Sequence, residues 1–348
     1  MNMDLANISI SSLVMHQVGN FSIGEGIKFS EELISHEKIE QDLLKLISNS
    51  FYDNEIYHFT IEEALSSNLV KETIKSIFNN QAQFYQKSID LARILYERST
   101  HTSIKKGDFY LVSLENILWK NQKINALALL KTEEKSTFLT VKNTANSFNI
   151  SSIKGISLKK VDKGCLILNH NEENGYTVLV ANNSKNNDAH YWINSFLHVK
   201  RFEDAYFQTE EFSKMCKEFI LNTKEIENSL TNTERIEKLH ETESYIAANA
   251  TLSIHDFKNT VLNDISLKKK FDEFRDAYQL NTGIRMYEEF NTSTDALKKV
   301  HKSMNKVIML DDSVRIIINK KFPLIEQGFD SSKNKHYYKI YFDDEKIK

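Results

Sequence analysis

The feature that most restricts the fold is a series of strand-like segments between Asp108 and Ala181. Val, Ile, Thr, Phe and Tyr are concentrated in these segments, and polar turn residues separate them. A tight connection is expected at Asn121-Gln122, and Asn174-Gly175 is the strongest hairpin signal in the chain. Short turns of this kind join antiparallel strands, so the pattern predicts an antiparallel meander. The predicted strands are residues 109–115, 123–133, 136–141, 153–156, 163–169 and 176–181.

Another strand and two helices are predicted before the meander. The strand covers residues 8–20 and ends at the turn pair Gly19-Asn20. One helical pattern covers residues 31–47, with Ser30 as its N-cap, and a longer one covers residues 69–98. Residues 1–200 are therefore expected to form an antiparallel β-sheet domain with inserted helices at about 30–98.

Beyond residue 201 the pattern becomes helical. Helices are predicted at 202–223, 224–248 and 266–279, with polar breaks between them. Strands return at 315–319 and 336–342, joined across Gly328 and Asp330. Residues 201–348 are expected to form a mainly helical domain ending in a β-hairpin. The predicted fold class is α+β: an antiparallel sheet domain with a helical insertion, then a helical segment and a terminal β-hairpin.

Several function classes have no support in the sequence. Cys165 and Cys216 form no CxxC pair, no apolar run is long enough to span a membrane, and the N-terminus lacks a signal-peptide pattern. Gly24 and Gly26 lack the third glycine of a dinucleotide-binding loop, and no metal-ligand or catalytic motif occurs. We therefore expect a cytoplasmic protein that is not an enzyme, with no cofactor, no metal and no membrane contact.

The charge is unevenly distributed along the chain. The formal net charge is −3, whereas nucleic-acid-binding proteins usually carry a basic footprint. Residues 25–63 contain ten acidic and three basic residues, a balance of −7. Residues 298–321 contain seven basic and two acidic residues, a balance of +5. This asymmetry allows a basic face on an acidic protein.

Four segments, in the same order along the chain, resemble the bacterial 37-kDa nucleoid-associated protein family (NdpA-like). They are the first strand, ISISSLVMHQVGN, whose His16 precedes the turn; the meander at 108–141; the segment YWINSFLHVKRFEDAYFQTEEFSKMCKEFI at 191–220; and the closing strand, loop and strand. This chain has His198-Val199 where relatives often carry a glycine or another small residue. The resemblance implies a bacterial cytoplasmic protein that is found with the nucleoid and binds DNA. It supplies no catalytic residues.

The first candidate for DNA contact is the basic segment near the C-terminus. If residues 298–306 are helical, Lys299, Lys302 and Lys306 share one stripe at i, i+3 and i+7. Such a stripe could neutralise phosphates and release counterions, although a solvated lysine-rich surface explains it equally well. The candidate residues are Lys298, Lys299, Lys302, Lys306, Arg315, Lys320 and Lys321.

A second candidate group lies on predicted loops and strand ends, where phosphate contacts are common. Ordinary surface lysines are the simpler interpretation of this group. His16 has no spaced partners and is expected to be a packed, hydrogen-bonded residue rather than a ligand. The second group consists of Lys159, Lys160, Lys163, Lys200 and Arg201.

Two functions follow from these observations. The first is a non-catalytic nucleoid-associated protein that binds DNA mainly through phosphates, as a monomer or a homodimer. The alternative is a protein–protein interaction module that recruits or regulates DNA-topology or anti-foreign-DNA machinery. In that case the acidic residues 25–63 and the helices after residue 202 would dock the partner protein.

Overall fold

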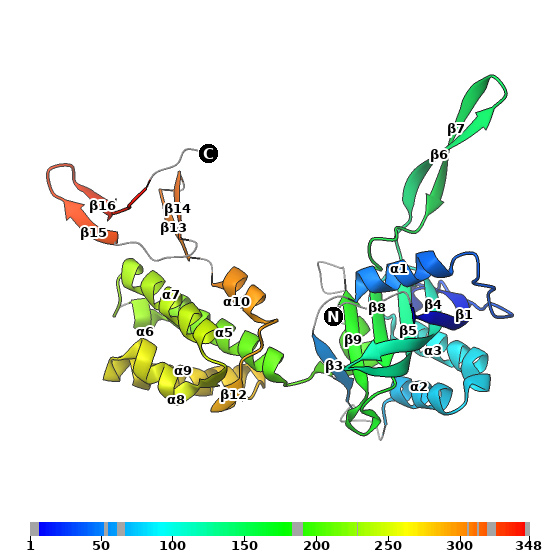
Figure 1. Cartoon of the computed structure of the whole chain (residues 1–348), viewed down its shortest axis with the longest axis horizontal. Helices are drawn as coiled ribbons and strands as arrows, with labels where there is room; N and C mark the ends of the chain where they lie inside the picture. Colours follow the sequence, from blue (N-terminus) through cyan, green and yellow to red (C-terminus); the bar gives the residue numbers. More distant parts are fainter. Residues whose placement is uncertain are drawn as a thin grey trace. The chain divides into compact units, whose positions relative to one another are not determined.

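The computed structural model describes residues 7–51, 55–60, 67–182, 191–227, 229–304, 306–311, 313–318 and 325–344. It divides into two compact units, residues 1–202 and 203–348. The first unit is built on an antiparallel sheet with helices on both faces, and the second is mainly helical with short two-stranded sheets (Figure 1). The predicted α+β fold class is confirmed.

The sheet of the first unit has eight strands in the order β10-β3-β9-β8-β5-β4-β1-β2, and all neighbours are antiparallel. The predicted meander is present in β4 and β5, which are joined at Lys120 and Asn121 with φ of 46° and 66°. Positive φ at both positions matches the right-handed twist of a two-residue hairpin. The strands are β1 (Ser9–Val18), β2 (Ile27–Lys28), β3 (Ile56–Phe59), β4 (Gly107–Trp119), β5 (Gln122–Thr132), β8 (Lys163–Leu168), β9 (Thr177–Asn182) and β10 (Val199–Arg201).

Helices cover both faces of this sheet. One face packs against α1 (Glu40–Ser50), and the other packs against α2 (Leu69–Asn79), α3 (Phe84–Arg98) and the π-helical turn η5 (Tyr191–Leu197). Short 3-10 turns lie at Phe21–Ile23, Gln81–Gln83 and Glu172–Asn174. Because both faces are buried, a central strand such as β8 is buried at every position instead of alternating.

The inserted helices differ from the prediction in two places. The helix expected from residue 31 begins only at Glu40. Before it the chain is held along the sheet, because the Ile34 N–H donates to the Leu13 carbonyl at 2.8 Å. The long helix expected at 69–98 is two helices, because Asn80 is extended and its side chain caps the turn that follows.

One predicted strand does not join the main sheet. Residues 136–141 were expected to continue the meander, but β6 (Ser136–Thr144) pairs with β7 (Ser147–Gly155) as a separate two-stranded sheet. Figure 1 shows this hairpin as a ribbon that leaves one end of the sheet. We call residues 136–155 the β6–β7 arm.

The second unit has a core of aromatic and aliphatic side chains, including Phe212, Phe219, Phe257 and Phe271. The terminal β-hairpin expected from the sequence is present as β15–β16, but the two predicted strands do not pair with each other, because they belong to different hairpins, β13–β14 and β15–β16. The elements are α5 (Ala205–Asn222), α6 (Lys224–Glu227), α7 (Asn232–Ala248), β11 (Thr251–Ser253), α8 (Ile254–Phe257), the π-helical turn η6 (Lys258–Leu262), α9 (Ile265–Thr282), β12 (Glu289–Asn291), α10 (Leu297–Ser303), β13 (Lys306–Leu310), β14 (Val314–Ile318), β15 (Ile325–Asp330) and β16 (Lys335–Ile340).

Both cysteines are buried and form no disulfide. Cys165 lies in β8 and Cys216 lies in α5, and burial raises the pKa of each thiol above its ordinary value. In the part of the chain that the structure describes, no helix is long and apolar enough to cross a membrane.

Candidate nucleic-acid interface

The β6–β7 arm is a regular hairpin with both strands exposed. Its nine pairs run from Ser136↔Gly155 at the base to Thr144↔Ser147 at the tip, and Ala145 and Asn146 form the turn. The Thr140 and Ser151 hydroxyls share a hydrogen bond of 2.7 Å across the strands. Each strand has nine residues, so the arm is about 30 Å long at the usual rise per residue.

One face of the arm is apolar towards its tip, whereas the opposite face carries the exposed pair Phe138↔Ile153 nearer the base. Residues paired across a hairpin share a face, so Val141↔Ile150, Leu139↔Ser152 and Asn143↔Phe148 lie on the same side. The four apolar side chains on this side are largely exposed: Leu139 74%, Val141 61%, Phe148 70% and Ile150 64%. Monomeric proteins rarely leave such a contiguous apolar face in water, so the face is expected to contact a partner molecule.

The arm and its flanks are also positively charged. From Lys135 to Val161 the sequence contains five lysines and no aspartate or glutamate. Lys142 and Lys154 are exposed on the arm, and Lys135 pairs with Asp108 at its base at 2.9 Å. Lys142 and Lys154 were not among the residues expected to contact DNA. The signal that could have found them is this acid-free stretch in a chain of net charge −3.

Of the second candidate group, Lys159 and Lys160 lie next to the arm and are exposed. Lys163 is the next lysine along the chain but is only 1% exposed, because it is the first residue of the buried strand β8. Its Nζ donates to Glu133 Oε2 at 2.7 Å. A buried lysine whose ammonium group is paired with a carboxylate cannot contact a phosphate, so Lys163 is not part of the proposed interface.

Glu133 holds two buried lysines at the base of the arm. Lys131 Nζ donates to Glu133 Oε1 at 2.8 Å, to the Lys105 carbonyl at 2.7 Å and to the Tyr191 hydroxyl at 3.2 Å. Burial lowers the pKa of Lys131, and the neighbouring Glu133 opposes that shift. The carboxylate is shared by two buried ammonium groups, so it is expected to be important for folding.

Lys200 and Arg201 lie on β10, the strand at one edge of the eight-stranded sheet. Lys200 is exposed, and Arg201 Nε lies 3.8 Å from Glu55 Oε2. In the strand order, β3 and β9 separate β10 from β8, the strand that follows Lys159 and Lys160. The two halves of this candidate group are therefore at different places on the sheet.

The C-terminal candidates lie partly on α10. Lys298 and Lys302 are exposed at i and i+4 on this helix, and Lys299 Nζ lies 5.5 Å from the centre of the Tyr206 ring. The expected stripe that includes Lys306 does not form, because α10 ends at Ser303 and Lys306 begins strand β13.

Lys306 is also buried. Its Nζ binds the Glu243 carboxylate, which His301 of α10 binds as well. Arg315 is exposed on β14 and its Nε contacts Met309 Sδ at 3.3 Å. Lys320 and Lys321 lie outside the described residues. The basic group of this unit is therefore smaller than the sequence suggested.

His16 is a packed residue of β1. The Ser30 N–H donates to its Nδ1 at 3.1 Å, so Nε2 carries the proton and donates to Ser88 Oγ at 2.9 Å, and Ser88 Oγ donates to the Tyr85 carbonyl. Burial lowers the pKa of His16 to about 4. The ring is therefore neutral at pH 7 and has both nitrogens occupied.

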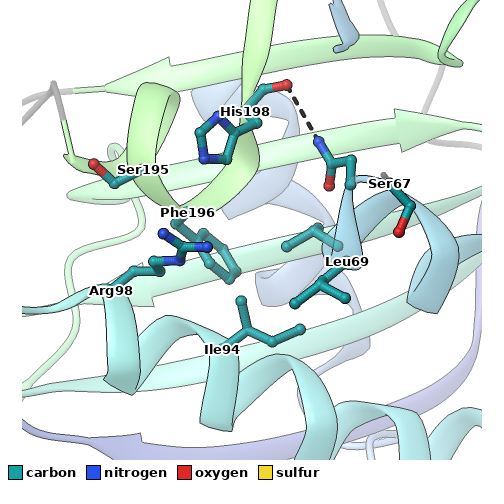
Figure 2. Close-up of a pocket in the computed structure, with 9 residues that line it drawn as sticks. Ser67, Leu69, Ile94, Arg98, Ser195, Phe196 and His198 are labelled. Atoms are coloured by element: carbon teal, nitrogen blue, oxygen red, sulfur yellow. Dashed lines mark hydrogen bonds between the residues drawn. The ribbon is translucent and has the colours of Figure 1, made fainter. Parts of the chain in front are cut away.

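A small pocket lies between the start of α2, the end of α3 and the turn after η5 (Figure 2). Asn68 caps α2 through its Oδ1 and donates from Nδ2 to the Leu197 and His198 carbonyls, at 2.9 and 3.3 Å. His198 has a φ of 50°, in the left-handed region that glycine adopts without strain, which explains why a small residue suits this turn. The volume of about 10 Å³ has room for about one water molecule.

Among the described residues, no group of three or more His, Cys, Asp or Glu side chains could hold a metal ion. A larger groove of about 260 Å³ lies on the second unit between α5 and α9. It is lined by Phe219, Thr223, Lys270, Glu273, Phe274 and Ala277.

These features define an α+β protein with an exposed, basic β-arm. A family model described as nucleoid-associated protein YejK (NA37) matches residues 14–348, which is essentially the whole chain. The protein therefore belongs to this family of nucleoid-associated proteins, and the resemblance found in the sequence is confirmed. Neither a search of curated proteins nor a search of solved structures finds a significant match.

Proposed function

We propose that this protein associates with the nucleoid by binding DNA, mainly through phosphate contacts made by lysines on and beside the β6–β7 arm. The observation that carries the proposal is the acid-free stretch from Lys135 to Val161, in which Lys142, Lys154, Lys159 and Lys160 are exposed to solvent. Exposed ammonium groups can neutralise phosphates and release counterions. Membership of a nucleoid-associated family supports the same conclusion.

This mechanism needs neither catalysis nor a cofactor. Phosphate contacts carry no sequence information, so we expect binding that tolerates any DNA sequence and weakens steeply with salt. The basic residues of α10, Lys298, Lys299 and Lys302, with Arg315, are proposed to add a second, weaker set of contacts. Binding as a homodimer is compatible with the mechanism but is not required by it.

The test is a titration of the full-length protein against a fluorescently labelled DNA duplex at several salt concentrations. Changing Lys142, Lys154, Lys159 and Lys160 to Gln should weaken binding at least tenfold and lower the slope of log affinity against log salt by up to about four. A matched variant with Lys120, Lys123, Lys269 and Lys333 changed to Gln has the same net charge and should bind like the wild type. Equal losses in both variants, or no binding of the wild type at low salt, would overturn the proposal.

One observation favours the alternative function, a module that binds another protein. The groove between α5 and α9 has Phe219 and Phe274 in its lining beside polar and charged residues, and grooves that combine apolar and polar groups bind helices or peptides of partner proteins. A Phe274→Glu variant should then lose partner proteins that cross-link to the wild type in host cells. The four-lysine Gln variant should keep them, which separates this function from DNA binding.

We also propose that residues 1–202 and 203–348 are separate folding domains. Each has its own buried core, so each is expected to unfold cooperatively when it is expressed alone. Urea unfolding of the two fragments checks this, and a fragment without a cooperative transition would contradict it.

A further inference from the structure

The four apolar side chains on one face of the β6–β7 arm have no role in contacts to phosphates. Leu139, Val141, Phe148 and Ile150 give this face the character of a buried surface, yet all four are exposed. In the β4–β5 hairpin of the same unit, side chains of this type pack beneath helices. No element in the described part of its own unit buries this face, so another molecule is its candidate occupant.

Charge identifies the chemistry of that occupant. Lys142 and Lys154 are the only charged residues between positions 136 and 155 of the sequence. Lys154 lies on the apolar face and Lys142 on the opposite one. An acid-free ribbon favours a polyanion over a typical protein surface. Among polyanions, duplex DNA also offers apolar surface, in the sugars that line its minor groove and in its stacked bases.

The size of the arm determines how the DNA groove must change to admit it. A two-stranded ribbon with its side chains is about 10 Å across, so it fits the major groove of B-DNA, about 12 Å wide, but not the minor groove, about 6 Å wide. The apolar face selects the minor groove, because that is where apolar side chains are inserted between base steps. The arm is about 30 Å long, close to one turn of the duplex, so it can follow the groove over that length. Entry requires a wider groove, and widening by inserted apolar side chains bends the duplex toward the major groove.

We propose that the β6–β7 arm enters the minor groove of double-stranded DNA with its apolar face against the base pairs, and that Phe148 partly separates a base step and bends the duplex. This inference rests on the proposed DNA binding and adds to it a bend in the DNA. Phe148 lies one residue from the turn, and the tip residues Ala145 and Asn146 are small and uncharged, so nothing bulky or acidic blocks entry.

The experiment measures bending and binding separately. A duplex of about 30 base pairs carries a donor and an acceptor dye at its two ends, and full-length protein is added at low salt. The test variant has Leu139→Ser, Val141→Ser, Phe148→Ser and Ile150→Ser together. The control variant has four changes on the opposite face: Thr140→Ala, Thr144→Ala, Asn149→Ala and Ser151→Ala. All eight positions lie on the arm, whose two strands are exposed, so circular dichroism and the urea midpoint should stay at wild-type values.

The wild type and the control variant should both raise energy transfer between the DNA ends. The four-serine variant should still bind, with an affinity about tenfold lower, and should leave energy transfer unchanged. Binding of the wild type without any change in energy transfer would overturn the inference and leave the proposed function standing. No binding at all would overturn both. A dimer of the wild type that becomes a monomer in the four-serine variant, seen by light scattering without DNA, would show that a second copy covers the face and would overturn the inference.

Discussion

The hairpins β4–β5 and β6–β7 follow one another in the chain and have the same antiparallel pairing, but their surroundings are opposite. In β5 every residue from Ala126 to Thr132 is buried, between α1 on one face and α2 and α3 on the other. In β6 and β7 nearly every residue is exposed, including six with large apolar side chains. Similar strand residues thus stabilise the fold in one hairpin and are available for intermolecular contact in the other.

The largest loss of stability on substitution is expected at the junction of the two hairpins. Glu133→Gln removes the carboxylate that Lys131 and Lys163 share, and the loss of a buried partner typically costs about 3–5 kcal/mol. Urea unfolding at pH 7 measures this loss of stability. The neighbouring Glu134 pairs with Lys105 in solvent, so Glu134→Gln should leave the urea midpoint nearly unchanged. Similar midpoints for the two variants would contradict the importance of the buried cluster.

A matched pair of leucines tests the comparison directly. Leu129 in β5 is fully buried, so Leu129→Ala should lower the free energy of unfolding by about 2–5 kcal/mol. Leu139 in β6 is 74% exposed, so Leu139→Ala should change it by less than about 0.5 kcal/mol. Urea midpoints compare the two variants. A large loss at Leu139 would show that the arm packs against the rest of its own chain.

The buried sheet should also respond to acid. The pKa of His16 is lowered to about 4 in the folded protein, against 6.5 in the unfolded chain. Between these values the unfolded chain binds a proton that the folded protein does not, so stability falls as pH drops from 6.5 toward 4, by up to about 3 kcal/mol. Urea unfolding at pH 7 and pH 4.5 measures the loss. His16→Gln should reduce this pH dependence, and an unchanged dependence would assign it to other groups.

The smallest effect on the free energy of unfolding is expected from the loss of a hydrogen bond within the arm. Thr140→Val removes the hydroxyl that bonds to Ser151 in an exposed hairpin, and should change the free energy of unfolding by less than about 0.5 kcal/mol. Urea unfolding of this variant beside the wild type provides the measurement. A loss above about 1 kcal/mol would mean that the arm contributes to the global stability of its unit.

The sequence predicts local structure well and long-range partners poorly. The strands of β4 and β5 follow from their residue pattern, but residues 136–141 have a similar pattern and pair elsewhere. Strand alternation indicates that a segment is extended, without indicating which surface will cover it. His16 is another case, because its environment depends on Ser88, which is 72 residues away.

The candidate site shows the same limit. Lys306 continues a helical spacing in the sequence, but α10 ends at Ser303, so spacing alone placed it on a stripe that does not form. Lys163 and Lys159 are close in sequence, and only burial in β8 separates the buried lysine from the exposed one. Lys142 and Lys154 could have been found, because the absence of acidic residues around them is visible in the sequence alone.

The burial of both cysteines has a practical consequence. Cys165 and Cys216 are the only thiols in the sequence, and each is enclosed in the core of its own unit with its pKa raised. Thiol reagents react with the exposed thiolate, so neither native cysteine should be modified in the folded protein. An Asn146→Cys substitution would thus place a single maleimide-reactive group at the tip of the arm, and a fluorophore or cross-linker could be attached there without first removing a native cysteine.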